Sequence, residues 1–183
     1  MQTIYSNSNN LLPAGGTCVT VGTFDGVHRG HAEILRFLKS VSVQNQLDSV
    51  VFTFGNHPRY VLNEDASDLK ILTTLSEKAH LISLFGIDHL YVQNFTTEFS
   101  SLHAEEFVAE ILVGKLKMKS LVVGHDHLFG KDRSGNFLLL SELSDKYGFS
   151  LIQIPAISSS GFNISSTKIR NLLAASDVQM AND

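Results

Sequence analysis

Residues 17–31 read TCVTVGTFDGVHRGH, and this stretch decides the fold. It opens with a run of β-branched and apolar residues, which predicts a buried strand over residues 17–24. It then passes through a glycine-bearing loop into residues 30–43, where apolar side chains recur at helical spacing. A strand, a polar loop and a helix in this order predict one strand–loop–helix unit of an α/β protein.

The same alternation continues along the rest of the chain. Further strands are predicted at residues 48–54, 87–93, 120–123 and 149–154, and further helices at residues 74–86, around 107–112, and at 138–147 and 166–173. Residues 74–77 have the form of a capping box, and residues 176–183 extend the last helix as a tail. Strands that alternate with helices indicate a parallel sheet, here five-stranded, with helices on both faces.

The composition is that of one globular domain. The chain has 183 residues, of which 43% are hydrophobic and 17% are charged. The formal net charge of −4 argues against a broad nucleic-acid surface, and no apolar run approaches the length of a membrane span. The first ten residues lack the features of a signal peptide, and the single cysteine, Cys18, suits a reducing compartment. We therefore expect one cytoplasmic domain over residues 1–183, with no nucleic-acid or membrane partner.

Two histidines bracket a glycine where the first predicted helix begins. In open parallel sheets ligands bind beyond the carboxyl ends of the strands, which is where His28 and His31 fall. Gly30 lets a ligand approach the backbone, and the amides of a helix N-terminus favour a phosphate group. Two imidazoles can donate hydrogen bonds to phosphoryl oxygens as charge develops. The alternative is a plain Asp25–Gly26 turn with two polar loop histidines, but a pair at this spacing favours the phosphate site.

A second anion site is indicated near the C-terminus, where residues 164–170 read ISSTKIR. Three hydroxyls precede a helix, and hydroxyls together with N-terminal amides favour a bound anion. Arg170 can clamp phosphate oxygens with its planar guanidinium group. The alternative is an ordinary Ser/Thr helix cap beside a solvated basic face.

These two stretches resemble the two signature motifs of the His-x-Gly-His nucleotidyltransferase superfamily. The resemblance implies a Rossmann-like nucleotidyltransferase fold and transfer of a nucleotidyl group with loss of pyrophosphate, with ATP as substrate and Mg²⁺ as cofactor. It implies that His28, His31 and Arg170 are catalytic, with the histidines at the α-phosphate and the arginine on the leaving pyrophosphate. It further implies an ATP-binding set that comprises Gly22, Thr23, Phe24, Gly30, Ser165, Ser166 and Thr167.

Further segments narrow the resemblance to the bacterial FAD synthetase family. Residues 53–58 read TFGNHP and follow the second predicted strand, whereas residues 124–130 read GHDHLFG and follow the fourth. The likeness also covers residues 72–75 with Lys78, and residues 105–108. It implies that the chain joins AMP from ATP to the phosphate of FMN. The candidate flavin-binding residues are Phe54, His57, Asp126, Phe129 and Arg133, with Lys131 as a second cation for the FMN phosphate.

Several of these assignments have alternatives. Phe54 and Phe129 fit core packing as well as flavin contact, and the cations at 131 and 133 fit a solvated loop equally well. Gly55 and Asn56 stand where the family usually has an acidic residue and a proline, and Leu128 stands where it usually has an arginine. These departures leave the ATP motifs intact and bear on flavin affinity.

The resemblance also bears on domain organisation and on competing functions. The family normally continues into a riboflavin kinase domain, which the expected domain over residues 1–183 lacks, so kinase activity should be absent. Another adenylyltransferase of the superfamily, such as a pantetheine-phosphate adenylyltransferase, is an alternative function. A flavin- or nucleotide-binding module without catalysis is a second.

Overall fold

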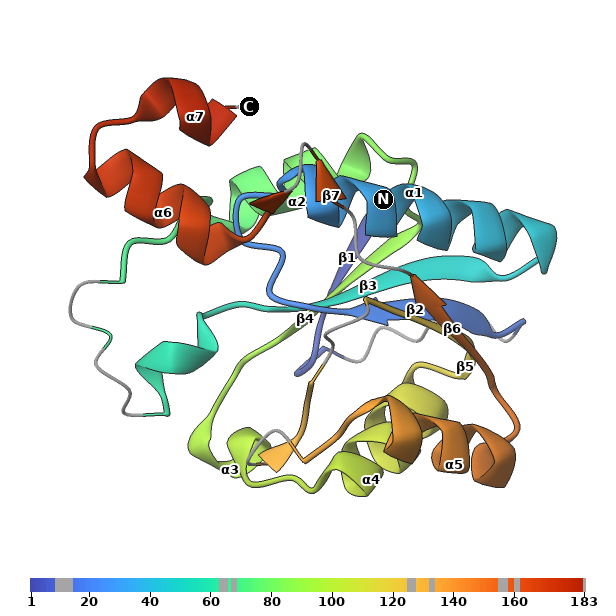
Figure 1. The fold of residues 1–183 in the computed structure, drawn as a ribbon. Coiled ribbons are helices and arrows are strands. Elements are labelled where there is room, and N and C mark those ends of the chain that lie inside the picture. The colour runs from blue at the N-terminus through green and yellow to red at the C-terminus, as the bar shows by residue number, and fades with distance from the viewer. Residues whose placement is uncertain are drawn as a thin grey trace.

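A computed structural model describes residues 1–8, 15–62, 66, 69–124, 128–131, 134–154, 158–159 and 162–182. Within these residues six strands form one parallel sheet in the order β1–β4–β3–β2–β5–β6. Helices cover both faces of this sheet (Figure 1), so the predicted α/β architecture is confirmed. The strand bounds are β1 Gln2–Tyr5, β2 Thr17–Val21, β3 Asp48–Phe54, β4 His89–Gln93, β5 Met118–Gly124 and β6 Ser150–Ile154.

The predicted count of five strands is wrong, because β1 adds a sixth strand at the edge beside β4. Its register runs from Gln2 opposite His89 to Tyr5 opposite Val92. Only Ile4 of this four-residue strand is buried, at 1% exposure. One buried residue gives no alternating pattern, so the strand could not be recognised from the sequence.

Helices close an apolar core on each face of the sheet. On one face α1 and α2 bury Leu35, Leu38 and Ile82 against the strands, and on the other η2 and α5 bury Leu112 and Leu140 (Figure 1). The helix bounds are α1 Arg29–Gln44, α2 Leu75–Ser83, α4 Ala104–Glu106, η2 Phe107–Lys115 and α5 Phe137–Tyr147. The predicted capping box is confirmed, since the hydroxyl of Thr74 accepts from the backbone of Glu77 and the Glu77 carboxylate accepts from the Thr74 N–H.

Several short elements were not predicted. They are η1 Pro58–Tyr60, α3 Thr97–Ser100, the antiparallel pair β7 Ser158–Ser159 and β8 Phe162–Asn163, and α7 Val178–Asn182. The predicted tail on the last helix is wrong, because α6 (Ser166–Ala174) ends before Ser176, whose φ of 62° breaks the helical path. No helix in the described part of the chain is long and apolar enough to cross a membrane.

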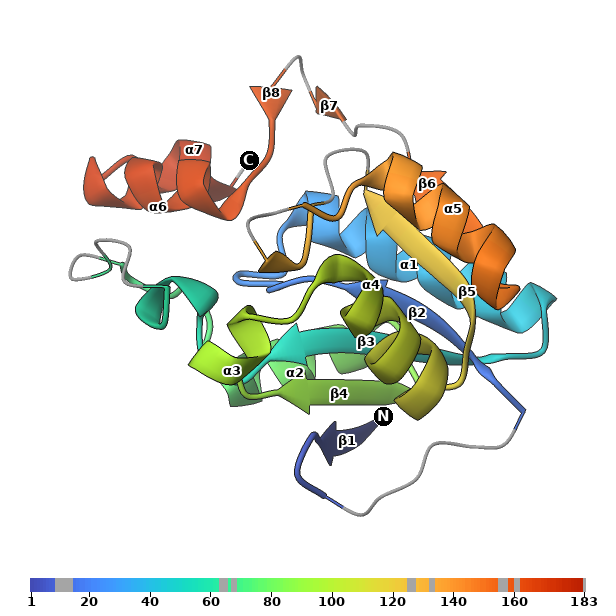
Figure 2. The same ribbon diagram turned by 90° about the horizontal axis from the view of Figure 1, so that it is seen from below.

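The order of the strands places a binding site at the carboxyl ends of β2 and β5. The chain runs from β2 outward through β3 to β4 and then crosses to β5 on the other side of β2. The carboxyl ends at such a reversal diverge and leave a crevice for ligands. Figure 2 shows β3 and β4 pointing toward α3 at this end of the sheet.

Candidate active site

The loop after β2 has an unusual backbone conformation. Phe24 has a φ of 49° and Val27 a φ of 39°, in the left-handed region that residues other than glycine rarely adopt. The strand therefore stops at Val21, three residues before its predicted end. A Cβ on Gly22 would lie 2.9 Å from the Phe24 ring, so this glycine is what lets the ring fold back and become buried. Such strained loops are concentrated at functional sites.

His28 and His31 lie together at the N-terminus of α1. Their rings stack with centroids 3.7 Å apart, and the His31 ring also lies 5.0 Å from that of Phe24. His28 caps the helix, because its Nδ1 accepts a hydrogen bond from the backbone N–H of His31 at 3.3 Å. A Cβ on Gly30 would lie 3.3 Å from the His28 ring, so the glycine leaves room for that ring. The predicted pair therefore stands where helix amides favour an anion.

The fold holds both histidines in the neutral form near pH 7. Burial, and after it the neighbouring His28, lowers the pKa of His31 to about 3. Burial also lowers the pKa of His28 below its usual value. Because Nδ1 of His28 accepts a hydrogen bond, its proton resides on Nε2, which can donate to a ligand. Nδ1 of His31 is buried without a hydrogen-bond partner among the described residues.

Asp25 joins three segments that are distant in sequence. Its Oδ1 accepts hydrogen bonds from the N–H groups of Leu72 at 2.9 Å and Thr73 at 3.0 Å. Its Oδ2 accepts from Nη2 of Arg170 at 2.6 Å, in a largely buried ion pair, and its carbonyl accepts from the hydroxyl of Ser166 at 2.9 Å. Burial alone would raise the pKa of Asp25, but the Arg170 and backbone hydrogen bonds hold it below its usual value.

The C-terminal motif is brought to the first loop by these contacts. Ser165 caps α6, since its hydroxyl accepts from the N–H of Lys168 at 3.3 Å, and Ser165 and Thr167 are exposed. Nε of Arg170 donates to the carbonyl of Lys70 at 2.9 Å. The cap interpretation is therefore correct for Ser165, and the guanidinium of Arg170 supports the fold in addition to any ligand that it binds.

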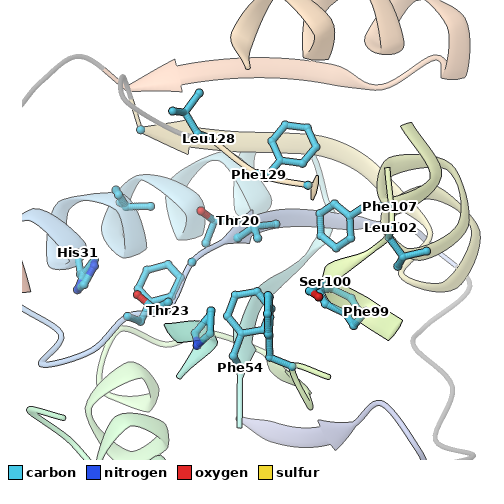
Figure 3. A pocket seen from close by; sticks show the side chains of 18 residues that line it. Thr20, Thr23, His31, Phe54, Phe99, Ser100, Leu102, Phe107, Leu128 and Phe129 are labelled. Atoms are coloured by element: carbon cyan, nitrogen blue, oxygen red, sulfur yellow. The ribbon is translucent and has the colours of Figure 1, made fainter. Parts of the chain in front are cut away.

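An aromatic cavity of about 450 Å³ lies beside the histidines (Figure 3). Phe54 and Phe129 line it as predicted, together with Phe95, Phe99 and Phe107. The rings of Phe54 and Phe95 meet edge to face at 5.2 Å, and those of Phe99 and Phe107 at 5.8 Å. The volume lies within the range of about 300–1,000 Å³ that small-molecule pockets occupy. The cavity can therefore take a flat apolar ring system.

The rim of this cavity joins the aromatic wall to the first loop. Thr23, Phe24 and His31 contribute to the lining, as does Gly22 beside them (Figure 3). Leu128, where the resemblance leads us to expect an arginine, also lines the cavity and is 44% exposed. A ligand in the aromatic cavity would thus extend directly to the histidines.

Asn56 fixes the segment that carries Phe95. Its Nδ2 donates to the carbonyl of Phe95 at 2.9 Å, and its Oδ1 accepts from the Phe95 N–H at 2.9 Å. This two-bond contact imitates strand pairing, and a proline side chain at this position could make neither bond. A Cβ on the neighbouring Gly55 would lie 3.0 Å from Oδ1 of Asn94, so the second departure also fits the local packing.

A second cavity, of about 230 Å³, adjoins the first and shares Thr23, Phe54 and Pro58 with it. His57 lies in this second cavity rather than in the aromatic one, and its Nδ1 accepts from the N–H of Arg59 at 3.3 Å. Burial lowers the pKa of His57. Asp25 and Lys78 line the same cavity.

Three of the residues predicted to bind the flavin remain. Asp126 and Arg133 lie outside the described residues, and Lys131 is exposed. The sequence interpretation missed the role of Asp25, which it named only within the alternative of a plain turn, and it missed Phe95 and Phe99. The latter two follow β4 four residues apart, and that position after a strand was the available signal.

The geometry described above agrees with three comparisons with known proteins. The family model described as FAD synthetase matches residues 13–168. A bifunctional riboflavin kinase/FMN adenylyltransferase from Escherichia coli strain K12 is 35% identical over 92% of this chain and 54% of its own length. The same-named protein from Buchnera aphidicola subsp. Acyrthosiphon pisum is 34% identical over 96% of this chain and 54% of its own length. This chain thus spans about half the length of these curated relatives.

Solved structures support the fold. A crystal structure described as a macrolide-efflux protein from Streptococcus pneumoniae matches with a TM-score of 0.85 and 28% identity, over 99% of this chain and 59% of that one. A pantoate-beta-alanine ligase from Francisella tularensis matches with a TM-score of 0.59 over 93% of this chain and 70% of that one, but at 16% identity it shows only a shared fold. The motifs, the topology and the family match agree, and the chain belongs to the FAD synthetase family.

Proposed function

We propose that this chain is an FMN adenylyltransferase, which transfers AMP from ATP to FMN and releases FAD and pyrophosphate. The observation that carries the proposal is a single cavity lined by five phenylalanines at one side and by His31 at the other. An aromatic slot suits the flat isoalloxazine ring, and a helix N-terminus suits a phosphate. The names of the curated relatives, which include FMN adenylyltransferase, support the same assignment.

In the proposed reaction an oxygen of the FMN phosphate attacks the α-phosphorus of ATP. A new P–O bond forms as the bond from the α-phosphorus to the bridging oxygen of the β-phosphate breaks, and pyrophosphate leaves with the electron pair. His28, neutral and protonated on Nε2, would donate a hydrogen bond to an α-phosphate oxygen. Such a donor stabilises charge that develops in the transition state. Catalysis would otherwise come from positioning.

The C-terminal motif would hold the leaving group. Ser165, Ser166 and Thr167 place hydroxyls at the N-terminus of α6, which favours the β- and γ-phosphates of ATP. Arg170 donates from Nε and Nη2 to protein oxygens, and within the described residues its Nη1 has no protein partner. That nitrogen remains to bind a phosphate oxygen, so Arg170 would serve both the loop and the nucleotide.

The proposal includes Mg²⁺ as a companion of ATP. Among the described residues no three His, Cys, Asp or Glu side chains come together at a possible metal position. Both carboxylate oxygens of Asp25 already accept hydrogen bonds. Mg²⁺ retains several waters and is often held through substrate phosphates with only one or two carboxylates. The described residues therefore fit a metal that arrives with the nucleotide as part of the substrate.

The proposal also includes a cytoplasmic location and a riboflavin kinase domain as partner. We infer a cytoplasmic location from the lone cysteine, Cys18, which is free and buried and needs no oxidising compartment. The relatives carry both activities in chains of which this one covers 54%, so a riboflavin kinase domain is the proposed partner. No nucleic acid or membrane is part of the proposed function.

An acceptor comparison tests the proposal against its alternatives. The purified chain is incubated with ATP, Mg²⁺ and either FMN or 4′-phosphopantetheine, and products are separated by chromatography. We expect FAD and an equal amount of pyrophosphate from FMN, and no product from the other acceptor. Product from 4′-phosphopantetheine alone would identify a different adenylyltransferase. Bound FMN that is never adenylylated would identify a binding module.

A further inference from the structure

Lys78 is a buried cation without a counterion in direct contact. It lies in the first turn of α2 and is 8% exposed. Its Nζ makes two long hydrogen bonds, to Oγ1 of Thr53 and to the carbonyl of Phe54, each at 3.4 Å. Both acceptors are neutral, and within the described part of the chain no carboxylate lies within ion-pair distance of Nζ. A buried charge is costly unless it is paired, so an anionic ligand group bound near Nζ would stabilise the ammonium of Lys78.

The carboxylate that lines the same cavity does not supply that anion. Asp25 lines the same cavity and raises the pKa of Lys78 against the lowering effect of burial. However, Oδ2 of Asp25 is bound to Arg170 at 2.6 Å, and its Oδ1 accepts from two backbone N–H groups. The charge of Asp25 is therefore matched by Arg170, and the ammonium of Lys78 is in excess.

The position of Lys78 indicates which ligand group could reach it. It lines the second cavity, whose shared wall with the aromatic cavity is formed by Thr23, Phe54 and Pro58. Thr23 in that shared wall belongs to the loop after β2 that leads to the histidines, and the positive charge of Lys78 lowers the pKa of His31 to a smaller extent than burial and the neighbouring His28. A ligand with its ring among the phenylalanines and an anionic end toward His31 would lie against this shared wall.

We propose that Lys78 binds the phosphate of the flavin acceptor and holds it in line with the histidine pair. This inference rests on the proposed function and deepens it, since it names the group that receives the acceptor phosphate. Two anionic phosphates must approach one another for the new P–O bond to form, and a buried ammonium reduces that repulsion. Lys78 neither gives nor takes a proton in this step; it binds and positions the attacking phosphate.

The test compares a flavin that carries the phosphate with a flavin that lacks it. Riboflavin is FMN without its phosphate, so binding of both flavins to the wild-type chain and to Lys78→Met is measured by quenching of flavin fluorescence without ATP. We expect Lys78→Met to weaken FMN binding on the order of 10-fold or more, the size of one lost charged hydrogen bond. Riboflavin binding should stay within about twofold, because its contacts are to the rings and not to the cation.

Controls make the outcome decisive. Lys119→Met removes an exposed lysine at the opposite end of β5 and should leave both affinities unchanged. Lys78→Gln is a second neutral variant for the case that Lys78→Met does not fold. Equal loss of FMN and riboflavin, or loss of ATP binding with FMN retained, would overturn the proposal. FAD formation by the wild-type chain is read separately, so failure of the proposed function is distinguishable from failure of the Lys78 assignment.

Discussion

At the scale of single residues, the site depends on side chains whose ionisation the fold has shifted. His31 has a pKa of about 3 in the folded chain, whereas a histidine in an unfolded chain titrates at about 6.5. Between these values the unfolded chain binds one more proton than the folded chain. The contribution of the neutral His31 to the free energy of unfolding is therefore fully present above pH 6.5 and is lost as the pH falls toward 3.

This shift predicts a specific pH dependence of stability. Each such histidine should lower the free energy of unfolding by about 1.4 kcal/mol for each pH unit of acidification. Replacement of His31 by Asn should reduce the slope between pH 6 and 4.5 by about that amount, as measured by urea unfolding. Both proteins carry the same carboxylates, so the contribution of the carboxylates cancels when the two slopes are compared. Equal slopes in both proteins would contradict the assignment of a buried neutral His31.

A second residue-scale prediction concerns Asn56. Asn56→Ala removes both hydrogen bonds that hold the Phe95 backbone beside the aromatic cavity. Because these bonds position the Phe95 ring in the cavity wall, we expect the KM for FMN to rise on the order of 10-fold while the KM for ATP stays unchanged. Steady-state kinetics with each substrate varied in turn provide the measurement, and Asn45→Ala, at the far end of α1, is the matched control. An equal rise in both KM values would show that Asn56 only supports the fold.

The sequence predicted the residues of the motifs better than their contacts. The sequence placed His28 and His31 together at one helix start and the C-terminal hydroxyls at another, because the spacing within each motif is local. The role of Asp25 was not found, because its partners Leu72 and Arg170 lie 47 and 145 residues away. Nothing in a short motif indicates that a carboxylate will receive an arginine from the other end of the chain.

At the scale of elements, the ion pair between Asp25 and Arg170 joins the loop after β2 to α6. Arg170→Ala would leave a buried carboxylate without its cation. Breaking one partner of a buried pair costs about 3 kcal/mol or more, and the exposed Arg36–Glu33 pair in α1 should contribute about 1 kcal/mol or less. We therefore expect Arg170→Ala to lower stability far more than Arg36→Ala.

The same variant tests the nucleotide role of Arg170. Because Nη1 remains for a phosphate oxygen, Arg170→Ala should also raise the concentration of ATP needed for half-maximal rate. Denaturant unfolding and ATP saturation curves measure the two effects on the same two variants. A loss of stability with unchanged ATP saturation would leave Arg170 as a structural residue only.

Long elements were predictable and short ones were not. α1, α2 and α5 were recognised because several turns of apolar periodicity and a capping box mark them. η1, α3 and α7 have five residues or fewer, so too few positions exist for a period to appear. Their conformation is set by tertiary contacts, such as the cap that His57 provides for η1.

At the scale of the whole molecule, we expect the edge strand β1 to contribute to stability and not to the binding site. Within the described sheet β1 pairs with β4 alone. The strands β4 and β3 lie between β1 and β2, whose loop carries the site. Ile4→Ala removes a side chain that is 1% exposed and should cost about 2–4 kcal/mol of stability. Turnover per folded molecule should not change. The measurement pairs thermal unfolding with kcat below the melting transition, and a matching fall in kcat would show that the edge strand communicates with the site.

The central claim is that the histidine pair and the aromatic cavity together transfer AMP to FMN. The most direct measurement uses ATP labelled at the α-phosphate, incubated with FMN and Mg²⁺ and with either the wild-type chain or His28→Ala. We expect labelled FAD from the wild type and a rate on the order of 100-fold lower from the variant, with ATP binding much less affected. The exposed His80→Ala should behave as wild type. Absence of labelled FAD from the wild type, or an unchanged rate in His28→Ala, would contradict it.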